Sequence, residues 1–311
     1  MIISDKESIP PAANRRVFAL EKRVERERLY DRCMLCPRKC GVDRNEGKTG
    51  YCGQKNTVKI ARADLHFWEE PEISGKEGSG TVFFTGCNLG CIYCQNHTIS
   101  RADTRSGREL SVSELSDVFL NLRDKGALNI NLVTAVMFVP SILDALDMAK
   151  EKGLTIPVVY NSSGYESVET LKLLKGYVDL YLPDLKYLDP ALSKEFSLAP
   201  DYPEVAKKAI EEMVSQTSVI VRHLVLPGHV NNSKEVLKYL YDTYGSKIKI
   251  SIMSQYTPIC GPFKEHAELN RRITKREYDK VVDYALSLGM ENAYIQEREV
   301  AKESFIPDFD M

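Results

Sequence analysis

The chain has 311 residues, enough for one barrel-sized domain with a small extension, and 28% of them are charged. Its 42 lysines and arginines nearly balance 44 aspartates and glutamates, and the net charge of -2 argues against an obligatory nucleic-acid surface. It contains no apolar run of about 18 residues and begins without a signal-peptide core, so we expect a cytoplasmic protein without membrane contact.

Residues 1–57 are expected to form a small N-terminal extension. Two prolines open a segment in which apolar residues from Val17 to Leu29 recur on one face, so we predict a helix over residues 10–30. Acidic and basic residues are interleaved at helical spacing along this stretch, which indicates a solvated face rather than a binding patch.

A cluster of cysteines follows the predicted helix. Its four members stand in a C-x2-C-x3-C-x11-C pattern with glycines nearby: Cys33, Cys36, Cys40 and Cys52. In a reducing compartment this spacing indicates metal ligation rather than disulfides. Ligand number and spacing suit both a zinc ion and a 4Fe-4S cluster, so both metals stay open. Two functions stay open as well, a stabilising staple and an electron relay.

Three further cysteines stand in a C-x3-C-x2-C pattern just after a short β-rich run: Cys87, Cys91 and Cys94. A 4Fe-4S cluster is normally held by four thiolates, so this triad leaves one iron open for a small molecule. His97 offers an alternative, because three cysteines and one histidine also complete a zinc site. Cys260 stands apart from both groups and is expected to be a buried structural thiol.

From residue 79 to residue 297 strand-like and helical segments alternate. Strands are expected at residues 81–84, 129–134, 157–160, 178–185, 218–226, 247–253 and 293–296. Helices are expected at residues 113–124, 140–152, 168–175, 204–215, 234–244 and 274–288. This alternation predicts parallel βαβ units, hence an α/β barrel or an open doubly wound sheet.

Polar residues at strand ends are the next candidates for a site. Asp184 and Lys186 are two positions apart, so the strand period places them on one face, as a surface ion pair or as part of a site. Arg222 stands inside an aliphatic strand, where an unpaired cation is costly, and its expected partner is Asp184 or a ligand carboxylate. Two other strands end in polar residues, namely Asn131, Thr134, Asn161 and Ser163.

The run Thr-Gly-Cys-Asn-Leu-Gly-Cys-Ile-Tyr-Cys-Gln-Asn around the triad resembles the signature of the radical SAM superfamily. The resemblance implies a partial (β/α)6 TIM-type barrel over residues 58–311, ending in a C-terminal extension. It also implies a 4Fe-4S cluster on the triad, S-adenosylmethionine at the open iron, and Tyr93 against the adenine. The Gly-Gly-Glu motif that often binds the methionine amino group is absent, so Asn131, Thr134 or nearby backbone carbonyls are expected to bind it.

Further segments resemble the glycyl-radical activating enzymes. The runs Asp184-Leu-Lys186 and Arg222-x4-Pro-Gly look like segments that lie beside S-adenosylmethionine in those enzymes. Asn161 and Ser163 precede Gly164 in what resembles their Asn-Gly turn, suited to the ribose or carboxylate, with an ordinary polar turn as the alternative. Including Glu69-Glu70-Pro71, the likeness to pyruvate formate-lyase activating enzyme-like proteins covers nearly the whole chain.

This resemblance implies an oxidoreductase that receives electrons from a low-potential donor, ferredoxin or flavodoxin. Reductive cleavage of S-adenosylmethionine would give a 5′-deoxyadenosyl radical that takes a hydrogen atom from a substrate. That substrate is a glycine of a glycyl-radical enzyme or, alternatively, a peptide, nucleotide or small metabolite. The remaining alternative is a non-enzymatic iron-sulfur electron carrier, which would need a fourth protein ligand for the triad.

Overall fold

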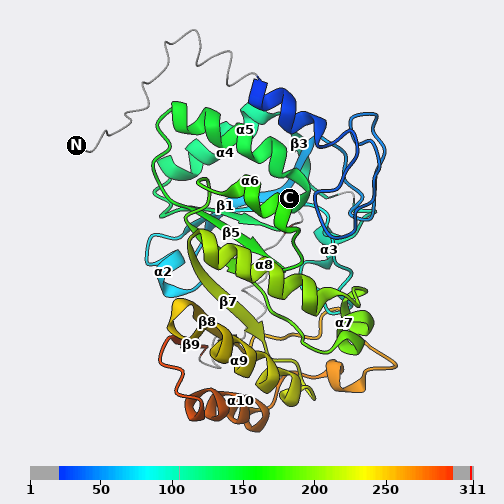
Figure 1. The fold of residues 1–311 in the computed structure, drawn as a ribbon, viewed down its shortest axis with the longest axis vertical. Helices are drawn as coiled ribbons and strands as arrows, with labels where there is room; N and C mark the ends of the chain where they lie inside the picture. The colour runs from blue at the N-terminus through cyan, green and yellow to red at the C-terminus, as the bar shows by residue number, and fades with distance from the viewer. Residues whose placement is uncertain (1–20, 105, 297–308, 310–311) are drawn as a thin grey trace, which may run out of the picture.

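The computed structural model describes residues 21–104, 106–296 and 309 (Figure 1). Residues 21–28 are helical, as expected for the second half of the predicted N-terminal helix, whose first half lies outside the described residues. The division into residues 1–57 and 58–311 stays a prediction. Within the described ranges, no helix combines the length and apolar character needed to cross a bilayer.

In the described part of the chain nine strands form one sheet, in the order β3-β1-β2-β4-β5-β6-β7-β8-β9. The strands are β1 (Val58–His66), β2 (Ser79–Phe84), β3 (Arg108–Leu110), β4 (Ile130–Val133), β5 (Val158–Ser162), β6 (Leu180–Pro183), β7 (Ser218–Leu224), β8 (Lys249–Met253) and β9 (Ala293–Ile295). From β2 to β9 neighbouring strands are parallel, whereas β1 pairs antiparallel with both β2 and β3. All carboxyl ends of the parallel strands therefore meet at one edge.

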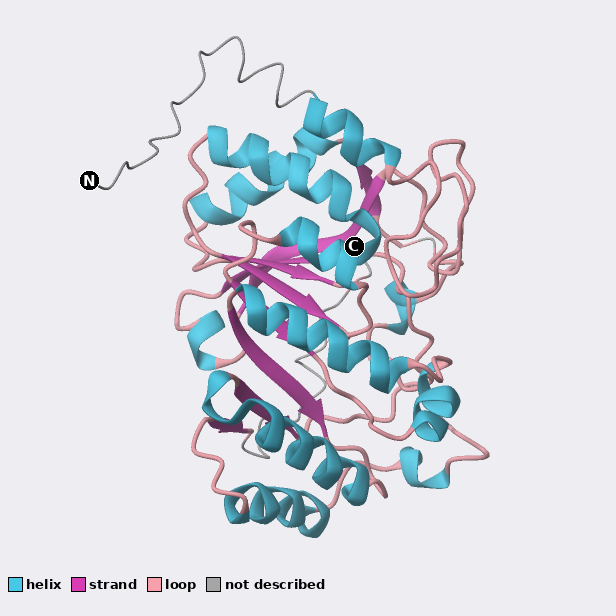
Figure 2. Cartoon of the chain, in the orientation of Figure 1, coloured by secondary structure: helices cyan, strands magenta, loops and turns pink. Residues whose placement is uncertain are grey.

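Helices connect most of the parallel strands and follow one another around the curved sheet (Figure 2). After the helical residues 21–28, the α-helices of the described chain are α2 (Pro71–Ser74), α3 (His97–Ser100), α4 (Val112–Asp124), α5 (Val139–Glu151), α6 (Val168–Leu174), α7 (Pro190–Ser197), α8 (Tyr202–Gln216), α9 (Val230–Tyr244) and α10 (Lys275–Ser287). The local sequence explains their starts. A capping box of Ser111 and Glu114 begins α4, and prolines in the first turn begin α5 and α8.

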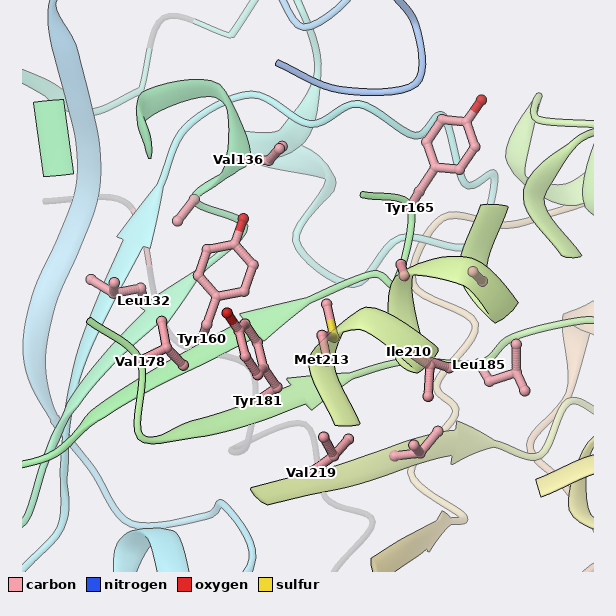
Figure 3. Packing of buried hydrophobic residues seen from close by; sticks show 14 of the residues in the cluster. Leu132, Val136, Tyr160, Tyr165, Val178, Tyr181, Leu185, Ile210, Met213 and Val219 are labelled. Carbon is pink, nitrogen blue, oxygen red and sulfur yellow. The ribbon is translucent and has the colours of Figure 1, made fainter. Parts of the chain in front are cut away.

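The core lies between the sheet and these helices. Figure 3 shows Tyr160 of β5 beside Tyr181 of β6, and Ile210 and Met213 of α8 in the same cluster. The two tyrosine rings meet edge to face with centroids 5.9 Å apart, a favourable aromatic geometry. Every residue of β2 is buried, as expected for a central parallel strand that is covered on both faces.

The predicted alternation of strands and helices is confirmed, and so is the α/β class with a mainly parallel sheet. The sequence analysis did not predict β1. This strand carries charged residues within an aliphatic pattern, and most of its residues are only half-buried, so its sequence lacks a clean two-residue alternation. The three-residue β3 and the short helices α2, α3 and α7 were also not predicted.

Candidate active site

A cavity of about 570 Å³, here called the site cavity, lies at the carboxyl ends of the parallel strands. Most residues singled out in the sequence line it, namely Cys87, Cys91, Tyr93, Cys94, Thr134, Asn161, Ser163, Asp184, Lys186 and Arg222. They come from loops or strand ends after β2, β4, β5 and β6, and from β7. The predicted convergence of these residues at one edge is therefore present in the structure.

The triad cysteines lie on the loop of residues 85–94, here called the cysteine loop, which follows β2. Two of the sulfur atoms have polar neighbours. The Leu89 amide donates to Cys87 Sγ at 3.4 Å, and Ser197 Oγ lies 3.0 Å from Cys91 Sγ. Burial raises the pKa of the Cys87 and Cys91 thiols, so iron or another cation is needed to favour their thiolate form.

Three soft sulfur donors in one cavity suit an iron-sulfur cluster better than a hard cation such as Mg²⁺. In the described residues, no group of three or more Cys, His, Asp or Glu side chains is arranged to hold a single metal ion. The match to a cluster thus rests on cysteine spacing, the shared cavity and the chemistry of sulfur.

His97 and Cys260 lie together beside the cysteine loop. Cys260 Sγ is 3.5 Å from His97 Nδ1 and donates to the Cys94 carbonyl at 3.1 Å. Cys260 stands apart from the triad in sequence, but a loop after β8 brings its thiol to the triad, and this thiol is half-buried, not fully buried as expected. His97, the alternative fourth ligand, contacts the Cys260 thiol.

Arg222 has two carboxylate partners on the loop between β1 and α2. Its Nε donates to Glu70 Oε1 at 2.8 Å and its Nη2 to Glu70 Oε2 at 2.6 Å, and Nη2 also contacts Glu69. Burial opposes the charge on Arg222, but the two carboxylates outweigh it and raise the pKa of the guanidinium. Against the penalty of burial, Arg222 lowers the pKa of Glu70.

The proposed pairing of Arg222 with Asp184 is wrong. Asp184 instead accepts a hydrogen bond from Lys186 at 2.5 Å, so the predicted contact is present, although both residues follow the end of β6 at Pro183. Burial lowers the pKa of Lys186, but the charges of Asp184 and Cys91 outweigh burial and raise it. Arg222 can satisfy its charge with the acidic pair because the loop between β1 and α2, which carries that pair, lies near β7 in the fold, although about 150 residues separate them in sequence.

Glu69 also accounts for the position of Asn131. The Asn131 amide donates to Glu69 Oε1 at 3.0 Å, and the Asn161 amide donates to the same oxygen at 3.5 Å. Asn131 is fully buried and does not line the site cavity, so it supports Glu69 in this structure. Glu69 and Glu70 were noticed in the sequence only as part of a family resemblance. The signal that points to them is an adjacent acidic pair that needs a cationic partner.

Two backbone conformations shape the floor of the site cavity. Thr134 has φ of +57° at the end of β4, an uncommon conformation for a residue with a side chain, and its amide donates to the Asn161 carbonyl at 2.9 Å. Gly164 has φ of +75°, and a Cβ there would lie 2.2 Å from the Asp184 carbonyl oxygen. The polar-turn interpretation of residues 161–164 therefore describes their backbone, and a ligand role for Asn161 and Ser163 stays a prediction.

Aromatic residues form two other parts of the cavity wall. Tyr93 is buried, packs edge to face on Phe196 and shares a hydrogen bond with the Tyr187 hydroxyl. Phe67 and Trp68 line the same cavity but, unlike the buried Tyr93, they are exposed, with 48% and 54% of their surfaces accessible to solvent. The cavity therefore joins a buried interior to an exposed aromatic rim.

This fold and site agree with a known superfamily. Residues 81–240, about half of the chain, match the family model described as the radical SAM superfamily. The chain belongs to this superfamily, whose members use a 4Fe-4S cluster to cleave S-adenosylmethionine, and its fold is the partial barrel that the resemblance implied.

Several proteins are similar to the chain. An uncharacterized protein of Methanocaldococcus jannaschii is 30% identical over 281 residues, which cover 88% of this chain and 80% of that protein. A pyruvate formate-lyase-activating enzyme of Clostridium pasteurianum is 28% identical over 51% of this chain and 66% of its own length.

Two solved structures are similar to the chain at low sequence identity. A point mutant of spore photoproduct lyase matches with a TM-score of 0.50 and 13% identity, over 75% of this chain and 78% of that one. SuiB of Streptococcus suis bound to S-adenosylmethionine matches over 68% of this chain with a TM-score of 0.48 and 14% identity. The chain spans about half of SuiB's length, 48%.

Proposed function

We propose that this chain is a radical SAM oxidoreductase in which the triad Cys87, Cys91 and Cys94 holds the catalytic 4Fe-4S cluster. The bound cluster and S-adenosylmethionine supply a 5′-deoxyadenosyl radical that takes a hydrogen atom from the substrate. The observation that carries the proposal is the single cavity that contains all three cysteines together with paired acidic and basic side chains.

The charges in the site cavity favour a cationic ligand. The cavity contains three carboxylates and two cations. Arg222 contacts both Glu69 and Glu70, and Lys186 donates to Asp184. One negative charge is left over among these groups. S-adenosylmethionine carries a sulfonium and an ammonium against one carboxylate, so its net positive charge complements the cavity.

Glu69 is the proposed acceptor for the methionine ammonium. The sequence lacks the Gly-Gly-Glu motif, but Glu69 places a carboxylate near the ends of β4 and β5, where Asn131 and Asn161 hold one of its oxygens. Tyr93, Thr134, Asn161, Ser163, Asp184 and Lys186 are proposed to surround the rest of the cofactor.

Changing Glu69 to Gln is expected to weaken S-adenosylmethionine binding about tenfold or more, because a charged hydrogen bond becomes a neutral one. Calorimetry on the anaerobically reconstituted protein measures this affinity. Glu204→Gln, which removes an exposed carboxylate paired with Lys207, is the matched control and should bind normally. Equal affinities for the two variants would show that Glu69 does not contact the ammonium.

A glycine of a glycyl-radical enzyme is the proposed hydrogen donor. The similarity to the Clostridium pasteurianum activating enzyme supports this substrate, although it covers only about half of the chain. Radical modification of a peptide, nucleotide or small metabolite is the alternative. The exposed aromatic rim of Phe67 and Trp68 gives the cavity an apolar surface for a substrate segment.

The decisive experiment is anaerobic reconstitution with iron and sulfide, followed by dithionite and S-adenosylmethionine. Formation of 5′-deoxyadenosine is the expected result. Its absence, with a reduced cluster seen by electron paramagnetic resonance, would favour an electron carrier. Replacing dithionite with reduced ferredoxin or flavodoxin tests the proposed electron donor.

A further inference from the structure

The four cysteines between residues 33 and 52, here called the four-cysteine knot, surround a small cavity of about 20 Å³. Cys33, Cys36, Cys40 and Cys52 all line it. Two tight backbone hydrogen bonds fold this segment, from Cys33 N to the Val42 carbonyl at 2.9 Å and from Gly41 N to the Cys33 carbonyl at 2.9 Å. The four cysteines therefore line one small cavity, although among the described residues they are not arranged as a closed site for a single metal ion.

A buried cation lies against the same cavity. The Arg44 side chain is almost fully buried, and its guanidinium donates to the carbonyls of Met137 at 2.6 Å, Gln54 at 3.1 Å and Lys55. It also approaches Cys33 Sγ at 3.8 Å. Among the described residues no carboxylate forms an ion pair with this guanidinium.

A buried guanidinium without a carboxylate is costly unless another anion offsets its charge. Neutral thiols do not supply such an anion. Four thiolates around a zinc ion, or around an oxidised 4Fe-4S cluster, carry a net charge of about minus two. An anionic, metal-loaded knot would therefore complement the charge of Arg44, whose guanidinium already donates to three backbone carbonyls and lies over the Tyr30 ring.

The knot also packs directly on the cysteine loop. Gly86 immediately precedes Cys87, and a Cβ at Gly86 would lie 2.6 Å from the Cys52 carbonyl oxygen. Arg38 Nε donates to the Asn88 carbonyl at 2.8 Å, and Asn88 lines the knot cavity as well. Figure 1 shows the blue loops of the N-terminal region beside α3, the helix that follows the cysteine loop.

The opposite side of the knot faces solvent. Cys40 is exposed, and so are the basic residues Arg32, Lys39 and Lys55. The triad, in contrast, lies within the site cavity, which the proposed cofactor and substrate would also occupy. A centre in the knot therefore stands between solvent, at the exposed Cys40, and the cysteine loop, so a donor protein can approach it from outside.

From this arrangement we propose that the four-cysteine knot binds a second 4Fe-4S cluster and is the entry point for electrons. A low-potential flavin or iron-sulfur protein gives one electron to the knot, and the knot gives one electron to the triad. The donor is oxidised, the triad is reduced, and no bond or proton changes in the transfer. That the triad accepts the electron rests on the proposed function, whereas the presence of a metal in the knot does not.

The metal test uses the variant Cys87→Ala/Cys91→Ala/Cys94→Ala, in which the knot is intact. After anaerobic reconstitution we expect about four irons per chain and the electron paramagnetic resonance signal of a reduced 4Fe-4S cluster. One zinc and no iron would overturn the relay in favour of a stabilising staple. Binding of neither metal would overturn the site itself. None of these outcomes depends on cleavage of S-adenosylmethionine.

The relay test uses Arg44→Gln in the otherwise unchanged chain. Loss of the buried positive charge should shift the reduction potential of the knot signal to more negative values and lower its iron content. We expect the rate of 5′-deoxyadenosine formation to fall at least tenfold more with reduced flavodoxin than with dithionite. An equal fall with both reductants, or an unshifted potential, would contradict the relay. Circular dichroism establishes that the variant is folded.

Discussion

Changing Cys87, Cys91 and Cys94 together to alanine should remove about four irons per chain and abolish formation of 5′-deoxyadenosine. The three thiols line one cavity after β2, and no other cysteine among the described residues lines that cavity. Iron analysis by colorimetry and product analysis by chromatography measure the two effects. Their expected size is the loss of all activity, because the cluster carries the chemistry.

Cys260→Ala is the matched control for the triad variant. Cys260 contacts the Cys94 carbonyl but does not line the site cavity, so its removal should leave the iron content unchanged. Cleavage of S-adenosylmethionine that persists in the triad variant would show that the cluster lies elsewhere. Loss of four irons from the Cys260 variant would indicate that its thiol is a ligand.

Changing Arg222 to alanine is expected to lower the free energy of unfolding by about 3 to 5 kcal/mol, measured by urea titration without S-adenosylmethionine. The change leaves Glu69 and Glu70 buried without a cation. Because the pKa of Glu70 is lowered in the folded chain, the stabilisation is present above its ordinary value of 4.5 and is lost as the pH falls below it.

Two further variants separate charge from packing in this experiment. Lys238→Ala breaks an exposed pair with Asp242 and should cost less than about 1 kcal/mol. Adding Glu69→Gln and Glu70→Gln to Arg222→Ala removes the uncompensated charges and should restore part of the lost stability. A loss below about 1 kcal/mol for Arg222→Ala alone would mean that the acidic pair is satisfied in another way.

Much of the barrel could be predicted because its elements have regular local patterns. Helices such as α4, with a capping box and one apolar face, and fully buried strands such as β2 stand out in the sequence. Strand β1, which lies between β3 and β2 in the sheet, does not, because its half-buried faces accept charged side chains and its identity depends on antiparallel pairing with both neighbours. Strand pairing is a tertiary property that periodicity does not encode.

The candidate site shows the same division between local and distant information. The sequence pairs Asp184 with Lys186 on the expectation that both lie in one strand, and the structure confirms their contact, although β6 ends at Pro183 and both residues follow it. It does not identify the partner of Arg222. Glu70 lies 152 positions away, and burial in the folded chain decides which of several carboxylates reaches the guanidinium.

The exposed aromatic rim has a practical consequence for studying this protein. Trp68 is the single tryptophan of the chain, it is about half exposed, and it lines the same cavity as the triad. Intrinsic tryptophan fluorescence therefore comes from one known position at the mouth of the cavity. Emission wavelength and quenching give a label-free optical signal for molecules that enter, and stopped-flow mixing can follow their arrival in real time.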